Sequence, residues 1–251
     1  MLVFGVIDDL TELSVPVKFL TQFIAAGVLV SGGVRLNLVG IGDAPNILLT
    51  LLWVVGLTNA FNHLDVMDGV AAACAFTAIA GLAAVSWFSG DIRLSLGTLV
   101  LLSCVAAFLP FNLPPARAYL GNAGSHFIGF CVAAVCLQAR YAPDRISLAV
   151  FAPLCICAFP ILDTLFLIAM RLAKRKSIFR KSNDHIVLRL RQAGLSRQSI
   201  LAAVFSVSAV FSLLGVAAVR VPEPLVVAML LAFVSLCAAL LWKVSHIEVK
   251  Q

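Results

Sequence analysis

Long apolar runs, separated by short polar breaks, follow one another along this chain from residue 17 onward. A helix that crosses the hydrocarbon core of a bilayer needs about 20 mostly apolar residues, so each run predicts one membrane-spanning helix. The eight runs lie near residues 17–35, 46–62, 70–88, 93–110, 126–141, 146–170, 199–219 and 225–243. The expected fold class is therefore all-α, a polytopic membrane protein of about eight transmembrane helices.

The breaks between the runs carry residues typical of turns and helix ends. Glycine, serine, aspartate and proline mark them, at residues 40–43, 89–91, 114–115, 143–144 and 222–224. Pro153 and Pro160 instead lie inside the sixth run. Proline removes a backbone donor and clashes with the preceding turn, so the pattern predicts a kink there, which a helix bundle can tolerate.

The composition supports a membrane setting and excludes a soluble domain. Of the 251 residues, 62% are hydrophobic and 12% are charged, and the mean hydropathy is +1.06. A soluble domain keeps about a quarter of its residues charged. The seven cysteines fall almost entirely within apolar runs and form no CxxC pair, so we interpret them as small hydrophobes, not as disulfides or metal ligands.

The basic residues predict which side of the membrane each break faces. Nine of the eighteen Lys and Arg lie in residues 171–198, and by the positive-inside rule this basic loop is cytoplasmic. Counting helices from it places residues 1–16, 63–69, 111–125 and the C-terminus on the same side. That side then carries thirteen basic residues and the other side five. The net charge of +6 thus indicates a membrane surface, and nucleic acid is not an expected partner.

Four polar clusters fall on this predicted cytoplasmic face. They are VIDDL at residues 6–10, NHLDVMDG at 62–69, GNAGS at 121–125 and KSNDHIVLRLR at 181–191. Loop polarity without a function would be scattered over both faces, and ionisable groups at membrane depth are functional as a rule. The pattern therefore predicts one polar site at the cytoplasmic boundary of the membrane.

Acids and amides in the first two clusters favour a divalent cation. Asp8 and Asp9 are adjacent carboxylates that repel each other unless they share a cation or a proton, although acids beside a helix start also occur without a function. Asn62, Asp65 and Asp68 follow one another at intervals of three, which places neighbouring members on one helix face. A polar helix end would explain part of this set, but carboxylate and amide oxygens also suit Mg²⁺ with substrate phosphates.

The other two clusters suggest contacts with an anion. GNAGS is a small-residue turn whose backbone N–H groups could meet a phosphate at a helix start. Residues 182–194 predict a short interfacial helix, capped by its first two residues and stopped by Gly194. This helix would present His185 and Arg189 as a clamp for a nucleotide diphosphate, although most of the loop's charge would also serve as a topology anchor. Asp163, inside the sixth run, is expected to pair with a base or to buttress the site.

These motifs, in this order, resemble the polyprenyl-phosphate N-acetylhexosamine-1-phosphate transferases, the family of the MraY translocase and of the WecA and TagO enzymes. The matching segments run across nearly the whole chain: GVIDDL, Lys18 with Gln22, NAFNHLDVMDG, GNAGSHFIGF, PILDTLF and the basic loop that ends in GLSRQ. The combination is specific, and it is most similar to the WecA/TagO branch.

The resemblance implies a reaction at the bacterial cytoplasmic (inner) membrane. A UDP-N-acetyl sugar would give its sugar-1-phosphate to a polyprenyl phosphate (undecaprenyl phosphate), with release of UMP, in cell-envelope polysaccharide synthesis. The expected partners are the lipid phosphate, the UDP-sugar, the bilayer and, as a further expectation, a second copy of the chain.

The resemblance also implies roles for the polar residues. The adjacent acids would orient or deprotonate the acceptor phosphate, and the acids after Asn62 would hold the nucleotide and the site geometry. The cofactor would be Mg²⁺, with Mn²⁺ as an alternative. The catalytic group is Asp8, Asp9, Asp65 and Asp68, the substrate-binding group is Lys18, His185 and Arg189, and the metal ligands are Asn62 and Asn122.

Three departures from the family pattern bear on activity. The family motif GDxGS reads GNAGS here, so Asn122 stands where an aspartate is expected. At a distance of about 4 Å and an effective dielectric constant of about 20, the attraction between one such charge and a monovalent cation is about 4 kcal/mol, and this attraction is lost. HxHH reads HIVL, so His185 is kept, Val187 and Leu188 replace two histidines, and the next residue, Arg189, keeps its place. This change indicates either a different sugar specificity or a loss of activity. Relatives carry two or three helices before the Asp-Asp motif, so residues 1–251 are expected to form a single transferase domain without them.

Two hypotheses of different classes follow. The leading one is a sugar-1-phosphate transferase. The competing one is a catalytically impaired member that binds lipid phosphate or UDP-sugar, or that serves as a subunit or scaffold for a full-length relative. A transporter is disfavoured, because the polar groups gather at one face and the midplane lacks an ionisable pathway.

Overall fold

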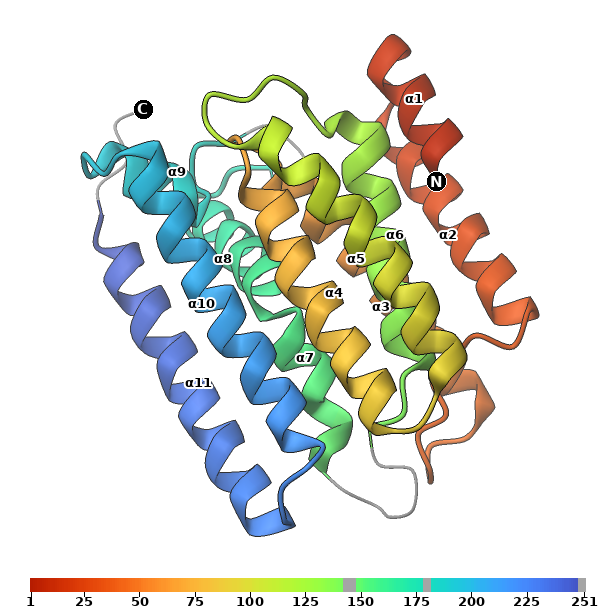
Figure 1. The fold of residues 1–251 in the computed structure, drawn as a ribbon. Coiled ribbons are helices and arrows are strands. Elements are labelled where there is room, and N and C mark those ends of the chain that lie inside the picture. Colours follow the sequence, from red (N-terminus) through yellow and green to blue (C-terminus); the bar gives the residue numbers. More distant parts are fainter. Residues whose placement is uncertain (142–147, 178–181, 248–251) are drawn as a thin grey trace.

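The computed structural model describes residues 1–141, 148–177 and 182–247, and all regular elements in these ranges are helices (Figure 1). The predicted turn at 143–144, the beginning of the sixth run and residues 178–181 of the basic loop lie outside the described residues. In chain order the helices are α1 (Leu2–Thr11), α2 (Val15–Ser31), α3 (Asp43–Leu64), α4 (Val70–Phe88), α5 (Ile92–Asn112), α6 (Gly121–Gln138), the 3₁₀ turn η1 (Leu148–Phe151), α7 (Ala152–Ile156), α8 (Ala158–Ala173), α9 (Ile186–Gln192), α10 (Arg197–Ala218) and α11 (Glu223–Ser245).

All eight apolar runs contain a helix, but the helices differ in length and polarity. Among the described residues, five are long and apolar enough to cross a membrane by themselves: α3, α4, α5, α10 and α11. A sixth span results if η1–α7 and α8 are counted as one. The other two runs fall on α2, which has 17 residues, and on α6, whose first turn is polar. The chain is a multi-pass membrane protein, while the number eight and the cytoplasmic face stay predictions.

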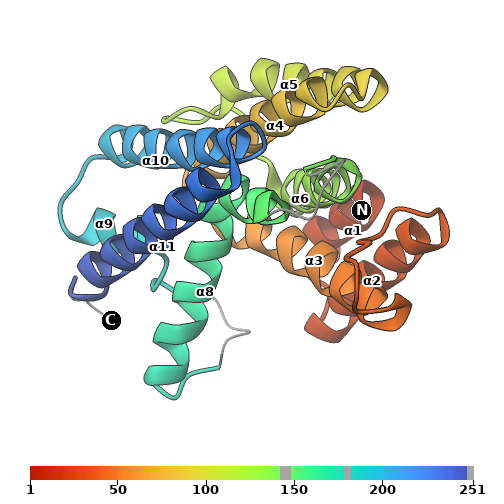
Figure 2. The same ribbon diagram turned by 90° about the horizontal axis from the view of Figure 1, so that it is seen from below.

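The predicted kink in the sixth run is present. Leu148–Ile156 and Ala158–Ala173 meet at an angle of 75°, with Cys157 between them. Pro153 and Pro160 lie in the first turns of α7 and α8, where a missing N–H removes no intrahelical hydrogen bond. The prolines therefore start two helices instead of breaking one. Figure 2 shows α8 projecting sideways from the bundle.

Small residues allow α4 to lie inside the bundle. Its sequence VAAACAFTAIAGLAAVSWF is rich in alanine. Of the 18-residue apolar stretch of α4, 78% is buried inside the protein, whereas the corresponding share for α11, at the edge of the bundle, is 11%. A Cβ atom at Gly81 would lie 2.1 Å from Ser212 Oγ of α10, so a larger residue there would force the Ser212 side chain to move. Helices in membranes associate through such close packing of small residues. Figure 2 shows α4 between α5 and α10, both of which it contacts extensively.

The helices bring the polar segments to one end of the bundle. Helix α1, the start of α6 and α9 lie at the end drawn at the top of Figure 1, which we call the site end. The α4–α5 and α10–α11 turns lie at the opposite end, the far end. The hydropathy pattern assigned residues 1–16 to a loop, but Leu2–Thr11 form α1. This helix packs closely on α6, because a Cβ at Gly5 would lie 2.4 Å from Ala123 Cα.

Candidate active site

Asp9 caps the start of α6. Its two carboxylate oxygens accept hydrogen bonds from the backbone N–H groups of Asn122 (2.9 Å) and Ala123 (3.0 Å). Gly121 has a φ of +60°, and a Cβ atom there would lie 2.9 Å from Asp9 Oδ2, so this position requires glycine. The N–H groups that the GNAGS turn could offer to a phosphate are thus held by an acid 113 residues earlier in the chain.

Asp8 turns toward α2 and is completely buried. Its Oδ2 atom lies 2.7 Å from Lys18 Nζ, and its Oδ1 atom accepts a hydrogen bond from Leu13 N at 2.9 Å. The Lys18 side chain stays 29% exposed. Since an ammonium group has three donors, the Asp8 contact orients Lys18 and leaves donors free for a further anion.

The two predicted metal ligands lie in direct contact. Asn62 Nδ2, in the last turn of α3, donates to Asn122 Oδ1 (2.9 Å) and to Ser125 Oγ (3.0 Å) in the first turns of α6. His126 Nδ1 lies 2.8 Å from the backbone oxygen of Asn122. The structure therefore brings together two amides that are 60 residues apart. In this arrangement Asn122 Oδ1 accepts from Asn62.

Asp65 and Asp68 lie in the segment between α3 and α4. Burial first, and then the charges of Asp68 and Asp9, raise the pKa of Asp65 from 3.8 to about 6. Asp68 Oδ2 accepts from Ala116 N at 3.3 Å and lies 3.7 Å from Arg197 Nη1. Among the described residues no cation forms an ion pair with Asp65. Positive charge would be stabilised there.

Other polar residues support the site, and the sequence assigned no role to them. Asn112, the last residue of α5, accepts from Gly69 N (3.1 Å) and donates to the backbone oxygen of Ala118 (2.9 Å). It thereby joins the segment after Asp68 to the segment before α6. Gln22 and Asn59 exchange side-chain hydrogen bonds between α2 and α3. Gln22 and Asn59 lie in segments that carry the family resemblance, whereas the sequence signal for Asn112 was an amide beside an apolar run.

Asp163 pairs with His185, as the sequence predicted for a buried acid in this run. Asp163 Oδ2 lies 2.7 Å from His185 Nδ1, and Oδ1 accepts a hydrogen bond from Ile186 N at 2.7 Å. Asp163 is completely buried and His185 nearly so. One carboxylate therefore orients the imidazole through Nδ1 and caps the first N–H of α9. No described residue forms a hydrogen bond with the other ring nitrogen, Nε2.

The short helix in the basic loop begins later than the cap residues suggested. Its first residue is Ile186 and its N-cap is His185, because Ser182 Oγ instead bonds to the backbone and side chain of Asp184. Gly194, with a φ of +93°, follows the C-cap, so the predicted stop is confirmed. Asp163, from another helix, supplies the cap that the loop sequence did not contain.

Arg189 is nearly fully buried and ties three segments together. Its guanidinium donates to Asp184 Oδ1 (2.9 Å) and to the backbone oxygen of Ile247 beyond α11 (2.8 Å), and it stacks over Phe166 at 5.2 Å. Asp184 also lies 2.5 Å from Lys174 Nζ. Arg189 therefore stabilises the loop in this conformation, and its contact with a diphosphate stays a prediction.

The predicted site residues form two adjacent groups at the site end. The first joins α1, α3 and α6 through Asp9, Asn62 and Asn122; the second joins α8 and α9 through Asp163 and His185. His63 connects them, because it interacts electrostatically with His185, Asp163 and His126. The sequence did not place His63 near both groups, and this position is one that only the fold reveals.

The fold and the site together define a class: a multi-pass, all-helical membrane protein with acids, amides and basic side chains gathered at one end of its bundle. The family model described as Glycosyl transferase family 4 matches residues 1–140, which is more than half of the chain and includes the whole first group of site residues. The chain belongs to this family.

Curated relatives cover most of the chain. It is 29% identical over 221 residues to the probable undecaprenyl-phosphate N-acetylglucosaminyl 1-phosphate transferase of Bacillus subtilis (85% of this chain, 62% of that protein). It is 29% identical over 262 residues to the undecaprenyl-phosphate alpha-N-acetylglucosaminyl 1-phosphate transferase of Escherichia coli K12 (96% and 71%). It is 30% identical over 231 residues to the decaprenyl-phosphate N-acetylglucosaminephosphotransferase of Mycobacterium tuberculosis H37Rv (80% and 57%). The chain thus spans between about half and three quarters of these relatives' lengths.

Proposed function

We propose that this chain transfers a sugar-1-phosphate from a UDP-sugar to a polyprenyl phosphate at the cytoplasmic face of a bacterial inner membrane. An oxygen of the acceptor phosphate forms a bond to the sugar-bound phosphorus, the bond from that phosphorus to the bridging oxygen breaks, and UMP leaves. The product is a lipid diphosphate sugar. The names of the relatives support N-acetylglucosamine as the sugar and undecaprenyl or decaprenyl phosphate as the acceptor.

The observation that carries the proposal is the convergence of three distant segments at one end of the bundle. Hydrogen bonds link Asp9 of α1 to Asn122 of α6 and Asn122 to Asn62 of α3, and Asp8, next to Asp9, pairs with Lys18 of α2. A lipid phosphate is confined to the membrane surface, and a nucleotide sugar is confined to water, so the two can meet only at such a boundary. The positive-inside count predicts that this boundary is cytoplasmic.

The described residues fit Mg²⁺ in charge and in ligand type. The raised pKa of Asp65 reflects burial beside two other acids, which a divalent cation would relieve. Asn62 and Asn122 are in contact and could each present an amide oxygen, with substrate phosphates and water completing the set. The described residues contain no group of three His, Cys, Asp or Glu that could hold a metal by themselves. A bound Mg²⁺, or Mn²⁺ in its place, would neutralise charge on the reacting phosphates.

The chain's own residues would bind the substrates and hold the reacting groups in position. Lys18, oriented by Asp8, would bind the acceptor phosphate. Asp9 holds the first turn of α6, and through it Asn122, in position. Asp163 holds His185 with Nε2 available for a phosphate oxygen. Such prepositioned charges are the main means by which phosphoryl transfer is accelerated.

A second candidate function is binding without turnover. Asn122 carries no charge where the family pattern has an acid, and the guanidinium of Arg189 is already engaged by Asp184 and by backbone oxygens. Both observations favour a family member that binds the nucleotide sugar or the lipid phosphate but catalyses transfer slowly. A homodimer is a further prediction, which the size of the purified protein in detergent would check.

The test uses the full chain in nanodiscs with undecaprenyl phosphate, Mg²⁺ and radiolabelled UDP-N-acetylglucosamine. We expect UMP and a radiolabelled lipid in equal amounts, and loss of both in Asp8→Asn. Asp43→Asn, an exposed acid at the far end, is the matched control and should behave as the parent chain. UDP-sugar binding with no UMP would support the second candidate, and neither binding nor turnover would contradict both.

A further inference from the structure

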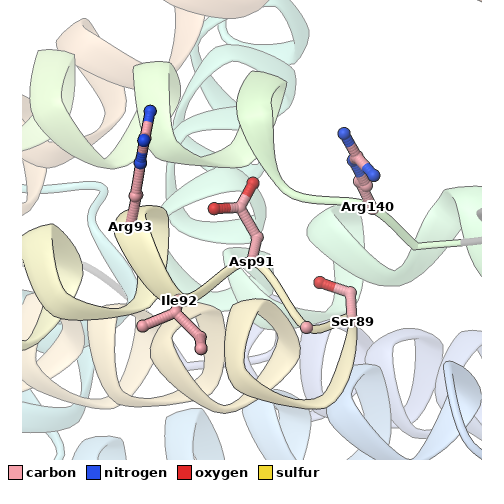
Figure 3. A pocket seen from close by; sticks show the side chains of 6 residues that line it. Ser89, Asp91, Ile92, Arg93 and Arg140 are labelled. Carbon is pink, nitrogen blue, oxygen red and sulfur yellow. The ribbon is translucent and has the colours of Figure 1, made fainter.

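A cleft of about 340 Å³ opens at the far end of the bundle, away from the site described above. It lies between the α4–α5 turn and the residue that follows the α6 C-cap (Figure 3). The described residues that line it are Ser89, Gly90, Asp91, Ile92, Arg93 and Arg140. The volume is within the range of small-molecule sites, and three of the six described lining residues are charged.

Within the described part of the chain, Arg93 and Arg140 have no partners of the kind that the other arginines at this end have. Arg35 lies 3.1 Å from Asp43, and Arg220 stacks over Phe88 at 4.8 Å. Arg93 and Arg140 are exposed, and neither forms an ion pair within the described part of the chain. Guanidinium groups arranged around one opening are suited to a phosphate, which they bind with charge-assisted hydrogen bonds.

Asp91 adds a negative charge between the two positive ones. Its Oδ1 atom accepts a hydrogen bond from Leu94 N at 3.0 Å and so caps α5. Its Oδ2 atom has no hydrogen-bond donor among the described residues. Figure 3 shows the carboxylate between Arg93 and Arg140, open to the cleft. The cleft therefore offers two cations and one anion, the complement of a ligand that carries both a phosphate and an amine.

The surroundings of the cleft are those of a membrane–water interface. Trp87 and Phe88, the last residues of α4, are exposed beside it, and aromatic side chains concentrate at that depth in membranes. Ile92, Leu96 and Val100 continue from the cleft along α5 at intervals of four residues, and all three are more than half exposed. Residues spaced in this way share one helix face, so a strip of apolar side chains extends from the cleft toward the bilayer core.

We propose that this cleft binds the phosphoethanolamine headgroup of a membrane phospholipid. Arg93 and Arg140 donate to the phosphate, the ammonium group donates to Asp91 Oδ2, and the acyl chains lie along the α5 strip. The positive-inside count assigns this end to the non-cytoplasmic side, where basic residues are the exception. A local anionic partner explains why two arginines that have no ion pair within residues 1–141, 148–177 and 182–247 occur there, and the lipid leaflet supplies that partner without a further protein.

The test measures lipid retention by native mass spectrometry of the full chain, released from nanodiscs that contain phosphatidylethanolamine, phosphatidylglycerol and phosphatidylcholine in equal amounts. We expect phosphatidylethanolamine to be retained about tenfold over the other two, since phosphatidylglycerol carries no cation and the quaternary ammonium of phosphatidylcholine has no N–H to donate to Asp91. Arg93→Gln combined with Arg140→Gln should abolish this preference. Arg35→Gln, an arginine of the same end that is already paired, is the matched control and should keep it.

Asp91→Asn tests the negative charge of the cleft without disturbing the fold. Asparagine caps a helix as well as aspartate does, so α5 should stay intact, while the charge that faces the ammonium group is removed. We expect this variant to retain phosphatidylethanolamine and phosphatidylglycerol equally. Equal retention of all three lipids by the parent chain, or an unchanged preference in the double arginine variant, would overturn the proposal. Sugar transfer at the site end plays no part in either outcome.

Discussion

His185 and Asp163 are 22 residues apart in the chain, yet His185 Nδ1 lies 2.7 Å from Asp163 Oδ2 in the interior of the protein. The same carboxylate caps α9 through Ile186 N. This contact fixes the imidazole relative to α8, and so relative to the site end, while Nε2 has no hydrogen-bond partner among the described residues.

Asp163→Asn is expected to lower sugar transfer by about 10- to 100-fold with little loss of folded protein. Asparagine keeps an oxygen for Ile186 N, but its amide can donate to His185 Nδ1 and so favour the wrong imidazole tautomer. The measurements are the initial rate of UMP release and the ¹⁵N NMR shifts of the His185 ring.

Histidine substitutions provide the matched control for this prediction. His185→Gln should lower transfer as strongly as Asp163→Asn, whereas His246→Gln, at the exposed end of α11, should have no effect. A fully active Asp163→Asn variant beside an inactive His185→Gln variant would contradict the orienting role of Asp163.

Gly121→Ala is expected to destabilise the chain by about 2 to 4 kcal/mol, which combines the cost of a left-handed alanine with the loss of a helix cap. The added Cβ would lie 2.9 Å from Asp9 Oδ2 and push it away from the start of α6. Thermal unfolding in detergent measures the effect. Gly97→Ala on α5, where a Cβ meets nothing within 4 Å, should leave stability equal or slightly higher, and equal losses in both variants would refute the Asp9 cap.

Asn122→Asp is expected to tighten Mg²⁺ binding by at least about tenfold, or about 1.4 kcal/mol, and to raise transfer activity. The new carboxylate would lie against Asn62 and add the charge that the family pattern carries. Isothermal titration with Mg²⁺ and UDP-sugar measures the change. Asn37→Asp, an exposed position, is the control, and no change in Asn122→Asp would show that residue 122 does not face the metal.

Asp184 should make stability depend on acid pH. Burial raises its pKa, but hydrogen bonds from Lys174, Ser182 and Arg189 together outweigh burial and lower the pKa below 3.8. A carboxyl whose folded pKa is depressed stabilises the fold above its unfolded pKa, and this contribution is lost as the pH falls from about 3.8 through the lowered value.

Asp184→Asn removes this stabilising contribution, so it should lower the free energy of unfolding by about 1 to 3 kcal/mol at neutral pH. The acid limb of the stability curve, which is the fall of this free energy as the pH drops through about 3.8, should become less steep. Chemical unfolding at a series of pH values measures both effects. An acid limb of the same steepness in the variant would show that other carboxyl groups cause it.

The sequence predicted the helices well, because each depends on a local run of apolar residues. All eight runs contain helices, and the kink near Pro153 and Pro160 is present. Helix α1 was missed, since its ten residues are too short to register as a span. The start of α9 was misplaced because its cap, Asp163, comes from a different helix.

The candidate site residues could also be predicted from the sequence, but their contacts could not. Asn62 and Asn122 were expected to act together, and they touch. Arg189 was expected to face a ligand, but it is buried against Asp184 and backbone oxygens. A residue type and its position in a motif indicate which chemistry is available, whereas burial depends on segments that lie far away in the chain.

By itself, the sequence determined that the chain is helical, that it belongs in a membrane, and that its acids, amides and bases occur at the ends of apolar runs, because these properties follow from local composition. Only the tertiary structure decided which of these groups meet. Asp9 caps a helix 113 residues away and Asp163 orients His185, because close packing of α1 on α6 and of α8 beside α9 sets those distances.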